Sequence, residues 1–319
     1  MTPKRSLASV IVVIAVTVCA LVTSAHATSP GKNGKIVFAG PSPNRLWVIN
    51  PDGTGVRKLT LTKGPQLNDE NPDWSPDGSR IAFERCAQIC QVWRINADGT
   101  ELKRLDPCEC GMPGWSPNGK QLAVSRFWGG VMNDESRFSE IFVKSAGGGA
   151  LRQVTHHTAS SPFSAQLRHP VWAPDGERLG FEVRNSPLGE PANRRALFII
   201  NADGSGQCQL TPWSLNGSDP DWSPHGNAIL FRSVPGREQH GNLYTVDADG
   251  SGLKQLTRYP APKALFSGSF SPDGKWITFS RFSGVTPYPG IFVMRANGTG
   301  VRLVSSGEYN VAPDWGPAR

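Results

Sequence analysis

The sequence predicts an all-β fold, a six-bladed β-propeller of four-stranded antiparallel blades closed by a composite blade from both termini. Three observations lead to this prediction. One pattern of four short strands and glycine-containing turns recurs along the chain, and the two ends carry complementary halves of that pattern. Glycine and proline are abundant, at 35 and 27 of the 319 residues, yet 38% of the residues are hydrophobic. Short, punctuated strands fit this composition better than helices or a disordered chain do.

The clearest copy of the pattern occupies residues 71–105. Four short segments in it have the character of strands, and these are residues 72–74, 81–83, 92–95 and 102–105. Between the first two segments, residues 75–78 read Ser-Pro-Asp-Gly, in which proline presets φ and glycine takes the position with positive φ. Residues 96–99, Asn-Ala-Asp-Gly, supply similar turn chemistry between the last two. One such sheet cannot bury both of its faces, so it requires neighbouring copies.

Every copy places a large aromatic residue at the end of its first strand, and these residues are Trp74, Trp115, Trp172, Trp222, Phe270 and Trp315. Their spacing varies from 41 to 57 residues, so the differences must lie in loops. Because the aromatic residues share one register, we expect the five tryptophans to pack between neighbouring sheets.

The two ends of the chain each hold an incomplete copy. Residues 35–38, 46–50 and 56–60 read as a second, third and fourth strand with no first strand before them. Residues 312–317 read as a first strand with nothing after it. Combined, the ends make one complete sheet, which closes a ring without leaving an exposed edge. An open stack of repeats is the alternative, but it would require capping repeats instead of complementary halves.

The repeat P-x-W-S-P-D-G-x-x-I-A-F, followed by a third strand, N-A-D-G and L-T, resembles the repeat of TolB-type (WD40-like) six-bladed propellers. The resemblance covers residues 34–317. TolB proper carries an additional N-terminal α/β domain that docks to inner-membrane partners, whereas about seven residues separate the predicted processing site from the first strand here. The resemblance therefore implies a free-standing TolB-like propeller outside the trans-envelope complex.

Residues 1–27 have the architecture of a secretory signal peptide, which leaves residues 28–319 as a single propeller domain. Lys4 and Arg5 form a basic start, residues 7–22 an apolar run, and residues 25–27 an Ala-His-Ala processing pattern. A membrane anchor is the competing interpretation, but the apolar run is short and a processing site follows it. Lipidation at Cys19 is a further alternative, disfavoured by the bulky valine before it. We expect an exported protein, periplasmic or extracellular, without stable membrane insertion.

The charge of the chain argues against a nucleic-acid partner. The formal net charge is +7, and loss of the two basic residues of the signal lowers it to +5. No run of lysine and arginine supplies the concentrated positive surface that nucleic acids require.

Antiparallel succession determines which loops share a face. The first-to-second and third-to-fourth connections are tight turns on one side, here called the turn face. The second-to-third loops and the crossovers between sheets lie together on the other side, here called the variable face. Its long loops are residues 126–140, 155–170, 182–196, 232–242, 257–268 and 280–290. Function on rigid repeat scaffolds concentrates in such loops, so any site is predicted on the variable face.

The candidate ligand- or partner-binding residues on this face are Arg85, Arg126, Trp128, Arg184, Trp213, Arg232, His240, Arg281 and Tyr288. The aromatic residues can stack on a sugar or anchor a protein partner, or alternatively plug the ends of the blades. The arginines recur just after the second strands and can form a positive mouth for an acidic ligand. The alternative is pairing with the crossover acids, namely Asp69, Glu70, Asp73, Asp219, Asp221, Glu308 and Asp314.

Four cysteines meet on the variable face by the same argument. Cys90 begins a third strand and Cys108 follows the neighbouring fourth strand, so we expect these two to be bonded, with Cys86 and Cys110 as the inner pair. Export favours two nested disulfides, and a four-thiolate zinc site is the rival. No partner for Cys208 is evident from the sequence, and we expect it to be buried.

Catalytic arrangements are sparse. No G-x-S-x-G nucleophile elbow occurs in the sequence. His156, His157, His169 and His240 map to the variable face and could bind a metal, as in the similar propeller lyases that act on pectin fragments, but their spacing is not diagnostic. The Ser-Pro-Asp-Gly turns resemble the Asp boxes of sialidases only superficially.

The sequence therefore predicts a non-catalytic, monomeric binding scaffold for a protein, a glycan or another macromolecule, without cofactor or metal. The alternative is a carbohydrate-active propeller enzyme, a lyase or glycosidase, with its site at the channel mouth. Three converging histidines or two carboxylates about 5–10 Å apart would favour the enzyme. Scattered histidines and carboxylates engaged by arginines would favour the binding scaffold.

Overall fold

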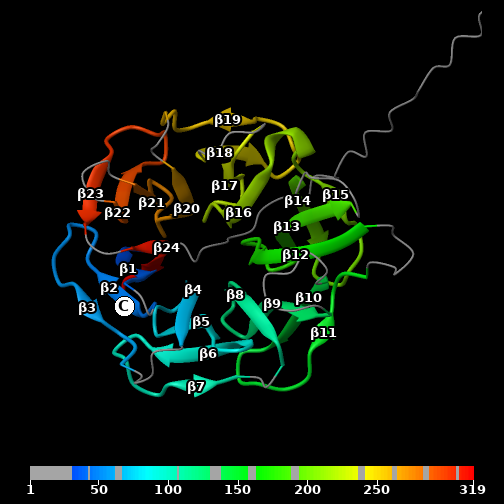
Figure 1. The fold of residues 1–319 in the computed structure, drawn as a ribbon, viewed down its shortest axis with the longest axis horizontal. Coiled ribbons are helices and arrows are strands. Elements are labelled where there is room, and N and C mark those ends of the chain that lie inside the picture. Colours follow the sequence, from blue (N-terminus) through cyan, green and yellow to red (C-terminus); the bar gives the residue numbers. More distant parts are fainter. Residues whose placement is uncertain are drawn as a thin grey trace, which may run out of the picture.

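The strands surround a common axis. In each group of four consecutive strands, the first strand is innermost and the short fourth strand is outermost (Figure 1). The computed structural model describes residues 31–41, 44–61, 67–105, 108–129, 138–156, 163–187, 194–235, 241–260, 264–282, 287–306 and 309–319, with the side chains of 163–165 and 185–187 excepted. Within these residues the chain is almost entirely strand and turn, and its one helix is the short 3-10 helix η1 (Trp213–Leu215). The predicted all-β propeller fold is confirmed.

Four sheets contain four strands each. The first consists of β24 (Val311–Pro317), β1 (Asn33–Ala39), β2 (Leu46–Ile49) and β3 (Arg57–Lys58). The second consists of β4 (Asn68–Trp74), β5 (Arg80–Cys86), β6 (Cys90–Asn96) and β7 (Lys103–Arg104). The third consists of β16 (Gly217–Trp222), β17 (Ala228–Ser233), β18 (Asn242–Asp247) and β19 (Lys254–Gln255). The fourth consists of β20 (Leu265–Phe270), β21 (Trp276–Phe282), β22 (Pro289–Arg295) and β23 (Arg302–Ser305).

The remaining strands form one sheet of eight. Its first run is β8 (Cys110–Trp115), β9 (Gln121–Trp128), β10 (Phe138–Ser145) and β11 (Arg152–Gln153). Its second run is β12 (Phe163–Trp172), β13 (Arg178–Pro187), β14 (Arg194–Asn201) and β15 (Cys208–Gln209). A single parallel pair, Ser139 with Gln166, joins the two runs, and the Ser139 hydroxyl donates to the Leu167 carbonyl at 2.8 Å. Six separate sheets were expected, but this contact of the long strand β12 merges two of them.

The two ends of the chain share one sheet, as predicted. Strand β24 pairs antiparallel with β1, and Trp315 lies opposite Ile36. The Trp315 indole N–H also donates to the Gly34 carbonyl at 3.2 Å. The last residues of the domain thus cover the edge that the first strand would otherwise expose.

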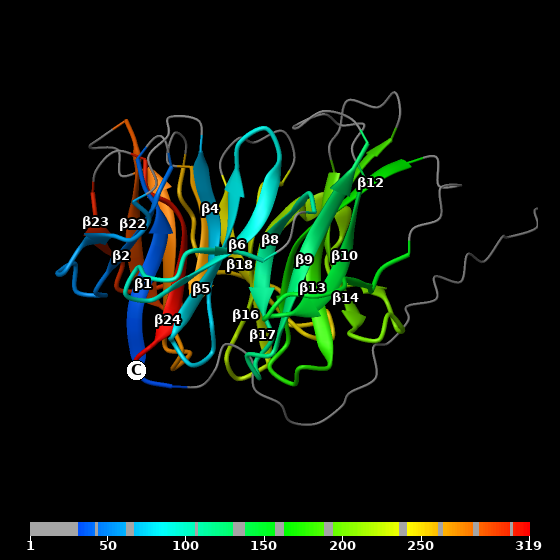
Figure 2. The same cartoon turned by 90° about the horizontal axis from the view of Figure 1, so that it is seen from below.

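The tight turns gather on one side of the molecule, where the C-terminus also lies (Figure 2). In the turn after β4, Gly78 has φ of +65°, and the Ser75 hydroxyl donates to Asp77 Oδ1 at 2.6 Å. In the turn after β6, Asp98 Oδ1 accepts from the Thr100 amide at 2.9 Å. These local bonds satisfy backbone and hydroxyl groups inside the turns.

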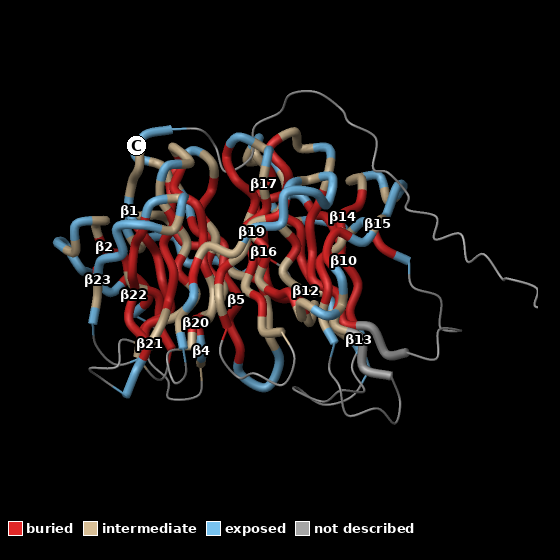
Figure 3. The backbone as a smooth tube through the Cα atoms, turned by 90° about the horizontal axis from the view of Figure 1, so that it is seen from above, coloured by how far each residue is buried: buried red, intermediate tan, exposed pale blue. Residues whose placement is uncertain are grey.

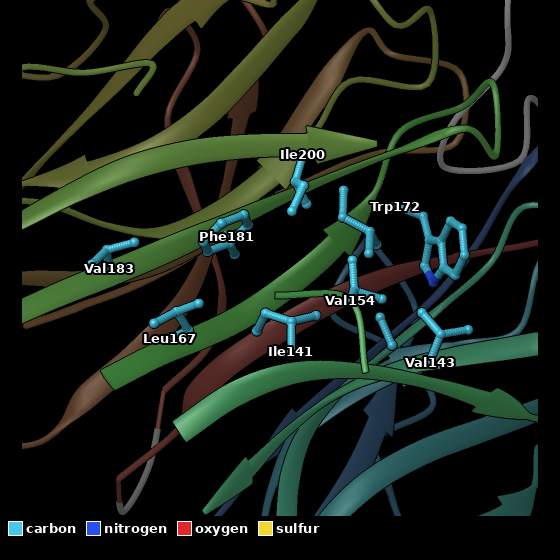
Figure 4. Close-up of a cluster of buried hydrophobic side chains, with 10 residues drawn as sticks. Ile141, Val143, Val154, Leu167, Trp172, Phe181, Val183 and Ile200 are labelled. Atoms are coloured by element: carbon cyan, nitrogen blue, oxygen red, sulfur yellow. The ribbon is translucent and has the colours of Figure 1, made fainter. Parts of the chain in front are cut away.

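The hydrophobic core lies between the sheets, and the buried parts of the chain form the interior walls of the ring (Figure 3). Figure 4 shows one such layer, in which Trp172, Ile141, Val154 and Phe181 meet from neighbouring runs of strands. The predicted core tryptophans are buried, with exposed fractions of 9% or less for Trp74, Trp115, Trp172, Trp222 and Trp315. Burial of an aromatic side chain of this size contributes about 2–3 kcal/mol or more, so this layer holds each sheet to the next.

A threonine two residues after the fourth strand has a specific role in four copies of the repeat. Its hydroxyl oxygen accepts the amide N–H of the residue 14 positions earlier, in the third strand, for Thr60, Thr155, Thr211 and Thr257, at 2.9–3.0 Å. All four threonines are buried. The hydroxyl thereby closes the end of each of these sheets where backbone pairing stops.

Within the described residues, no helix is both long and apolar enough to cross a bilayer.

Candidate functional site

Each first strand carries a bulge, which in five of them lies just before a proline. The residue before the proline has φ from 48° to 53° at five such positions, and these are Asn71, Met112, His169, Asp219 and Ala312. The strand pairing shifts register at the same points. Proline has no N–H to donate, so the ladder cannot continue through it, and an extra residue is accommodated there. In β20 the corresponding residues are Ser267 and Gly268.

All these bulge residues line one cavity of about 380 Å³ at the centre of the ring. Six ionisable side chains line it toward the variable face and are here called the mouth cluster: Arg168, His169, Glu182, Arg195, Asp219 and Arg232. They come from β12, β13, β14, β16 and β17. Three further carboxyls, those of Asp73, Asp221 and Asp314, line the same cavity. The cavity is therefore the point at which the bulges and the ends of the second strands converge.

The carboxylates of the mouth cluster are engaged by neighbouring groups. Asp219 Oδ1 lies 3.5 Å from His169 Nε2, and its Oδ2 accepts from the Ser218 hydroxyl at 2.9 Å. Glu182 Oε1 lies 3.5 Å from Arg195 Nε. The ligand atoms of His169, Glu182 and Asp219 lie within 4.8 Å of one another and could surround a metal ion. Three guanidinium groups around them oppose a further cation.

The surroundings of Asp219 favour its charged form. Burial tends to raise the pKa of Asp219, but His169, Arg232, the Ser218 hydroxyl and Arg195 outweigh it and hold that pKa below its ordinary value. Burial lowers the pKa of the Arg232 guanidinium, with Asp219 acting in the opposite direction. An arginine pKa is so high that the group keeps its proton regardless. The Asp219 carboxylate thus lies among positively charged groups.

Deeper in the ring, three aspartates form a belt that ties the sheets together, here called the carboxyl belt: Asp73, Asp221 and Asp314. Each accepts the amide N–H of the aromatic residue that ends the first strand of the next sheet. The distances are 2.6 Å from Trp115 N to Asp73, 2.7 Å from Phe270 N to Asp221 and 2.8 Å from Trp74 N to Asp314. A small cavity of about 60 Å³ separates the belt from the turn face.

Burial raises the pKa of all three belt carboxyls. For Asp73 the neighbouring Asp314 and Asp221 charges add to the effect of burial, and for Asp221 the Asp314 charge does so. The pKa of Asp314 is raised to about 6, chiefly by burial, while its hydrogen bonds act in the opposite direction. The belt therefore exchanges protons in a range in which ordinary aspartates do not.

The structure places Arg85, one of the predicted ligand-binding residues, in a buried ion pair. Its Nε and Nη2 lie 2.5 and 2.9 Å from the two carboxylate oxygens of Asp69, and the side chain is 4% exposed. The guanidinium also lies over the rings of Phe83 and Trp93. For this arginine the geometry matches the pairing alternative that the sequence left open.

The other predicted arginines are dispersed. Arg126 is exposed and lies over the Phe142 ring, and Arg281 lies over the Tyr259 and Phe292 rings at 4.3 and 4.2 Å. Arg184 is half-buried in β13. Of the predicted candidates within the described residues, Arg232 alone lines the cavity. The arginines therefore form no single ring around the mouth.

Among the predicted aromatic candidates, Trp128 ends β9 opposite Phe138, with exposed fractions of 42% and 43%. Tyr288 is 46% exposed. Trp213 is half-buried and packs against Phe198, with ring centroids 5.9 Å apart, so it covers the end of a sheet.

His240, His157 and Glu308 lie outside the described residues. His156 is exposed, and His169 is the one histidine that lines the cavity within the described chain. The described residues therefore bring no three histidines together.

The predicted disulfide pairing is wrong. The bonds join Cys86 to Cys90 and Cys108 to Cys110, instead of forming nested pairs. Cys86 and Cys90 are direct cross-strand partners at the end of the β5–β6 hairpin, whereas Cys110 is the first residue of β8 in the next sheet. With both pairs oxidised, these cysteines are not thiolate ligands, which removes the zinc alternative. Cys208 is half-buried in β15, and its thiol is not free.

Sequence reasoning missed Arg168, Glu182 and Arg195 as members of one cluster. The signal that could have located it is the position before proline in the first strand, where His169 and Asp219 stand. The repeat demands a bulge at that position, so its residue is directed to the axis in every copy.

Comparisons with known proteins agree with this architecture. A sequence profile described as TolB beta propeller domain matches residues 112–319. An uncharacterized peptidase of Bacillus subtilis is 25% identical over 219 residues, which are 66% of this chain and 29% of the relative. A Tol-Pal system protein TolB of Anaeromyxobacter sp. is 32% identical over 137 residues, 42% of this chain and 30% of the relative. The chain spans less than a third of the length of either relative.

Two solved structures illustrate the shared fold. TolB from Acinetobacter baumannii superposes with a TM-score of 0.67 at 18% identity, covering 89% of this chain and 67% of that one. An oligogalacturonate lyase in complex with manganese superposes with a TM-score of 0.56 at 15% identity, covering 82% and 70%. The strand pattern, the closed ring and the profile match over residues 112–319 together establish that this chain belongs to the TolB β-propeller domain family.

Proposed function

We propose that this chain is an exported TolB-like propeller that binds a protein partner through its variable face, without chemistry of its own. The observation that carries the proposal is the aromatic pair Trp128 and Phe138. These side chains lie opposite each other at the end of the β9–β10 hairpin, each more than two-fifths exposed. Adjacent exposed aromatic side chains on a rigid hairpin are typical of protein contact sites.

The chemistry of the mouth supports binding over catalysis. A general acid–base pair requires carboxyl groups whose pKa values are driven apart and whose oxygens face the substrate. Here Glu182 is engaged by Arg195 and Asp219 by His169 and Ser218. The belt carboxyls of Asp73, Asp221 and Asp314, whose pKa values are raised, also line the cavity, but each accepts a backbone amide. One histidine, His169, lines the cavity within the described residues. A metal-dependent lyase or a two-carboxylate glycosidase would require a different arrangement of these groups.

The relatives of this chain belong to more than one class of protein. They include Tol-Pal system TolB proteins, peptidases and, by fold alone, an oligogalacturonate lyase. The peptidase from Bacillus subtilis is matched over 29% of its length, which is compatible with a shared propeller and a separate catalytic part. Export through residues 1–27, a monomeric state and the absence of cofactor remain parts of the proposal.

Site-specific photo-crosslinking in the producing cells tests the binding surface. We expect a photoreactive phenylalanine at position 138 to trap a partner protein that Trp128→Ala no longer captures. The matched control is the same probe at Leu253, which is 48% exposed but follows the turn between β18 and β19 on the turn face. Equal adducts from both positions, or an adduct insensitive to Trp128→Ala, would remove this face from consideration. Stacking on a glycan would give no protein adduct and would contradict the proposal.

A further inference from the structure

Two arginines of the mouth cluster, Arg168 and Arg232, lack the carboxylate partner that Arg85 has. The Nε atoms of Arg168 and Arg232 are buried without a hydrogen-bond partner among the described residues. Neither guanidinium forms an ion pair within 4.0 Å in the described chain. Arg85, by contrast, is held by both oxygens of Asp69. Buried polar groups without partners are rare, because desolvation is then uncompensated.

The two carboxylates of the mouth cluster form no ion pair within 4.0 Å with these arginines. Asp219 is in contact with His169 and Ser218, and Glu182 with Arg195. Asp219 acts on Arg232 through its charge, without direct contact. The cavity is therefore lined by two guanidinium groups that form no ion pair with a described carboxylate, and an anion is the group that would complement them.

From this geometry we propose that the cavity binds a carboxylate side chain of an acidic peptide, with Arg168 and Arg232 as the recognising residues. This inference deepens the proposed function and rests on it. The planar guanidinium group matches a carboxylate with two parallel hydrogen bonds. A cavity of about 380 Å³ lies in the range that holds a small ligand group, such as one or two side chains.

The floor of the cavity favours a carboxylate over a phosphate. Five prolines line it, and these are Pro72, Pro113, Pro170, Pro220 and Pro313. Proline has no N–H, so the backbone supplies few of the donors from which phosphate sites are built. The rim adds Phe266, which is fixed edge-to-face against Phe282 with ring centroids 5.4 Å apart, and Tyr309, which is 41% exposed. These apolar surfaces suit the methylene groups and backbone of a peptide.

The test uses the full exported chain and two fluorescent peptides, acetyl-Gly-Glu-Trp-Glu-Gly-amide and the same peptide with glutamine in place of both glutamates. We expect the glutamate peptide to bind at least about tenfold more tightly, a difference of about 1.4 kcal/mol. Arg168→Gln and Arg232→Gln should each weaken its binding about tenfold or more. Raising the salt concentration from 50 to 300 mM should weaken it further.

The matched control is Arg94→Gln. Arg94 also has a buried Nε without a partner in the described chain, but it does not line the cavity. This variant should bind the glutamate peptide like the parent protein. A urea unfolding curve for each variant separates loss of binding from loss of folding. We expect Arg168→Gln and Arg232→Gln to be no less stable than the parent protein, because neither replacement breaks an ion pair.

Equal affinity for the two peptides, or unchanged affinity in both arginine variants, would overturn the inference. Arginine-dependent binding of trigalacturonate or inorganic phosphate in place of the peptide would also overturn it. None of these results depends on the crosslinking at position 138. Failure of the peptide-binding inference would therefore leave the proposed protein-binding face untouched, and the reverse also holds.

Discussion

Replacement of Asp314 by asparagine should make the protein more stable at neutral pH and nearly unchanged at pH 4. Asp314 accepts the Trp74 amide at 2.8 Å and the Ser269 hydroxyl at 2.9 Å, and so it joins three sheets of the ring. Asparagine has one oxygen for the amide and an NH₂ group that can donate to the serine oxygen. The variant therefore keeps both contacts and removes only the charge.

The magnitude follows from the raised pKa. Burial raises the pKa of Asp314 from 3.8 to about 6, so near pH 5 the folded state binds a proton that the unfolded state has lost. The contribution of Asp314 to stability is therefore fully present below pH 4 and is lost as pH rises through about 6. A shift of about 2 units at about 1.4 kcal/mol per unit gives a loss on the order of 3 kcal/mol by pH 8. Asparagine avoids that loss.

Urea unfolding followed by tryptophan fluorescence from pH 4 to pH 8 measures this effect. We expect the free energy of unfolding to decline less steeply for Asp314→Asn than for the parent, with some decline left because the pKa values of Asp73 and Asp221 are also raised. The control is Asp98→Asn, an exposed turn residue whose pKa is lowered, so that it titrates below this range. Parallel curves for Asp314→Asn and the parent would refute the reasoning, as would a variant that is less stable at every pH.

Two further predictions concern structural contacts of the variable face. Asp69→Ala should lower the free energy of unfolding by about 3–5 kcal/mol, because it leaves the buried Arg85 guanidinium without its partner. In urea titrations, the double replacement of Asp69→Leu with Arg85→Met should recover most of that loss. Additive losses from the two replacements would contradict this prediction. Trypsin digestion of the denatured, unreduced protein should release the Cys86–Cys90 and Cys108–Cys110 disulfides on separate peptides, because trypsin cleaves after Arg94, which lies between them. Two peptides joined by disulfides in the mass spectrum would instead indicate the nested pairing.

The fold could be predicted because its determinants are local and repeated. A turn such as Ser75 to Gly78 has a mechanism within four residues, and the tryptophan before it marks the same register in each copy. Ring closure could also be predicted, since the halves at the two ends are complementary, and Trp315 does lie opposite Ile36. What could not be predicted was the single pair, Ser139 with Gln166, that merges two sheets, because it depends on how far β12 extends.

The candidate site was harder to predict for a different reason. Arginines after the second strands share a sequence register, but Arg85 meets a carboxylate and Arg281 meets aromatic rings, so their common register does not bring them to one place. Cys86 and Cys90 pair across one hairpin because β5 and β6 stay in register to their ends. Loop assignment gives the face of the ring on which a residue lies, but not its depth or its neighbour.

The bulge before each proline explains how one fold can carry different sites. The backbone there has the same positive φ whether the residue is Asn71, Met112, His169, Asp219 or Ala312, so the conformation does not depend on the side chain. A left-handed conformation is unfavourable for most of these residue types, and the surrounding hydrogen bonds and packing must maintain it. Because the sheets supply that constraint in every copy, the side chains at these positions can change without rebuilding the ring. The chemistry of the cavity is then set by the bulge residues together with the few charged residues at the ends of neighbouring strands.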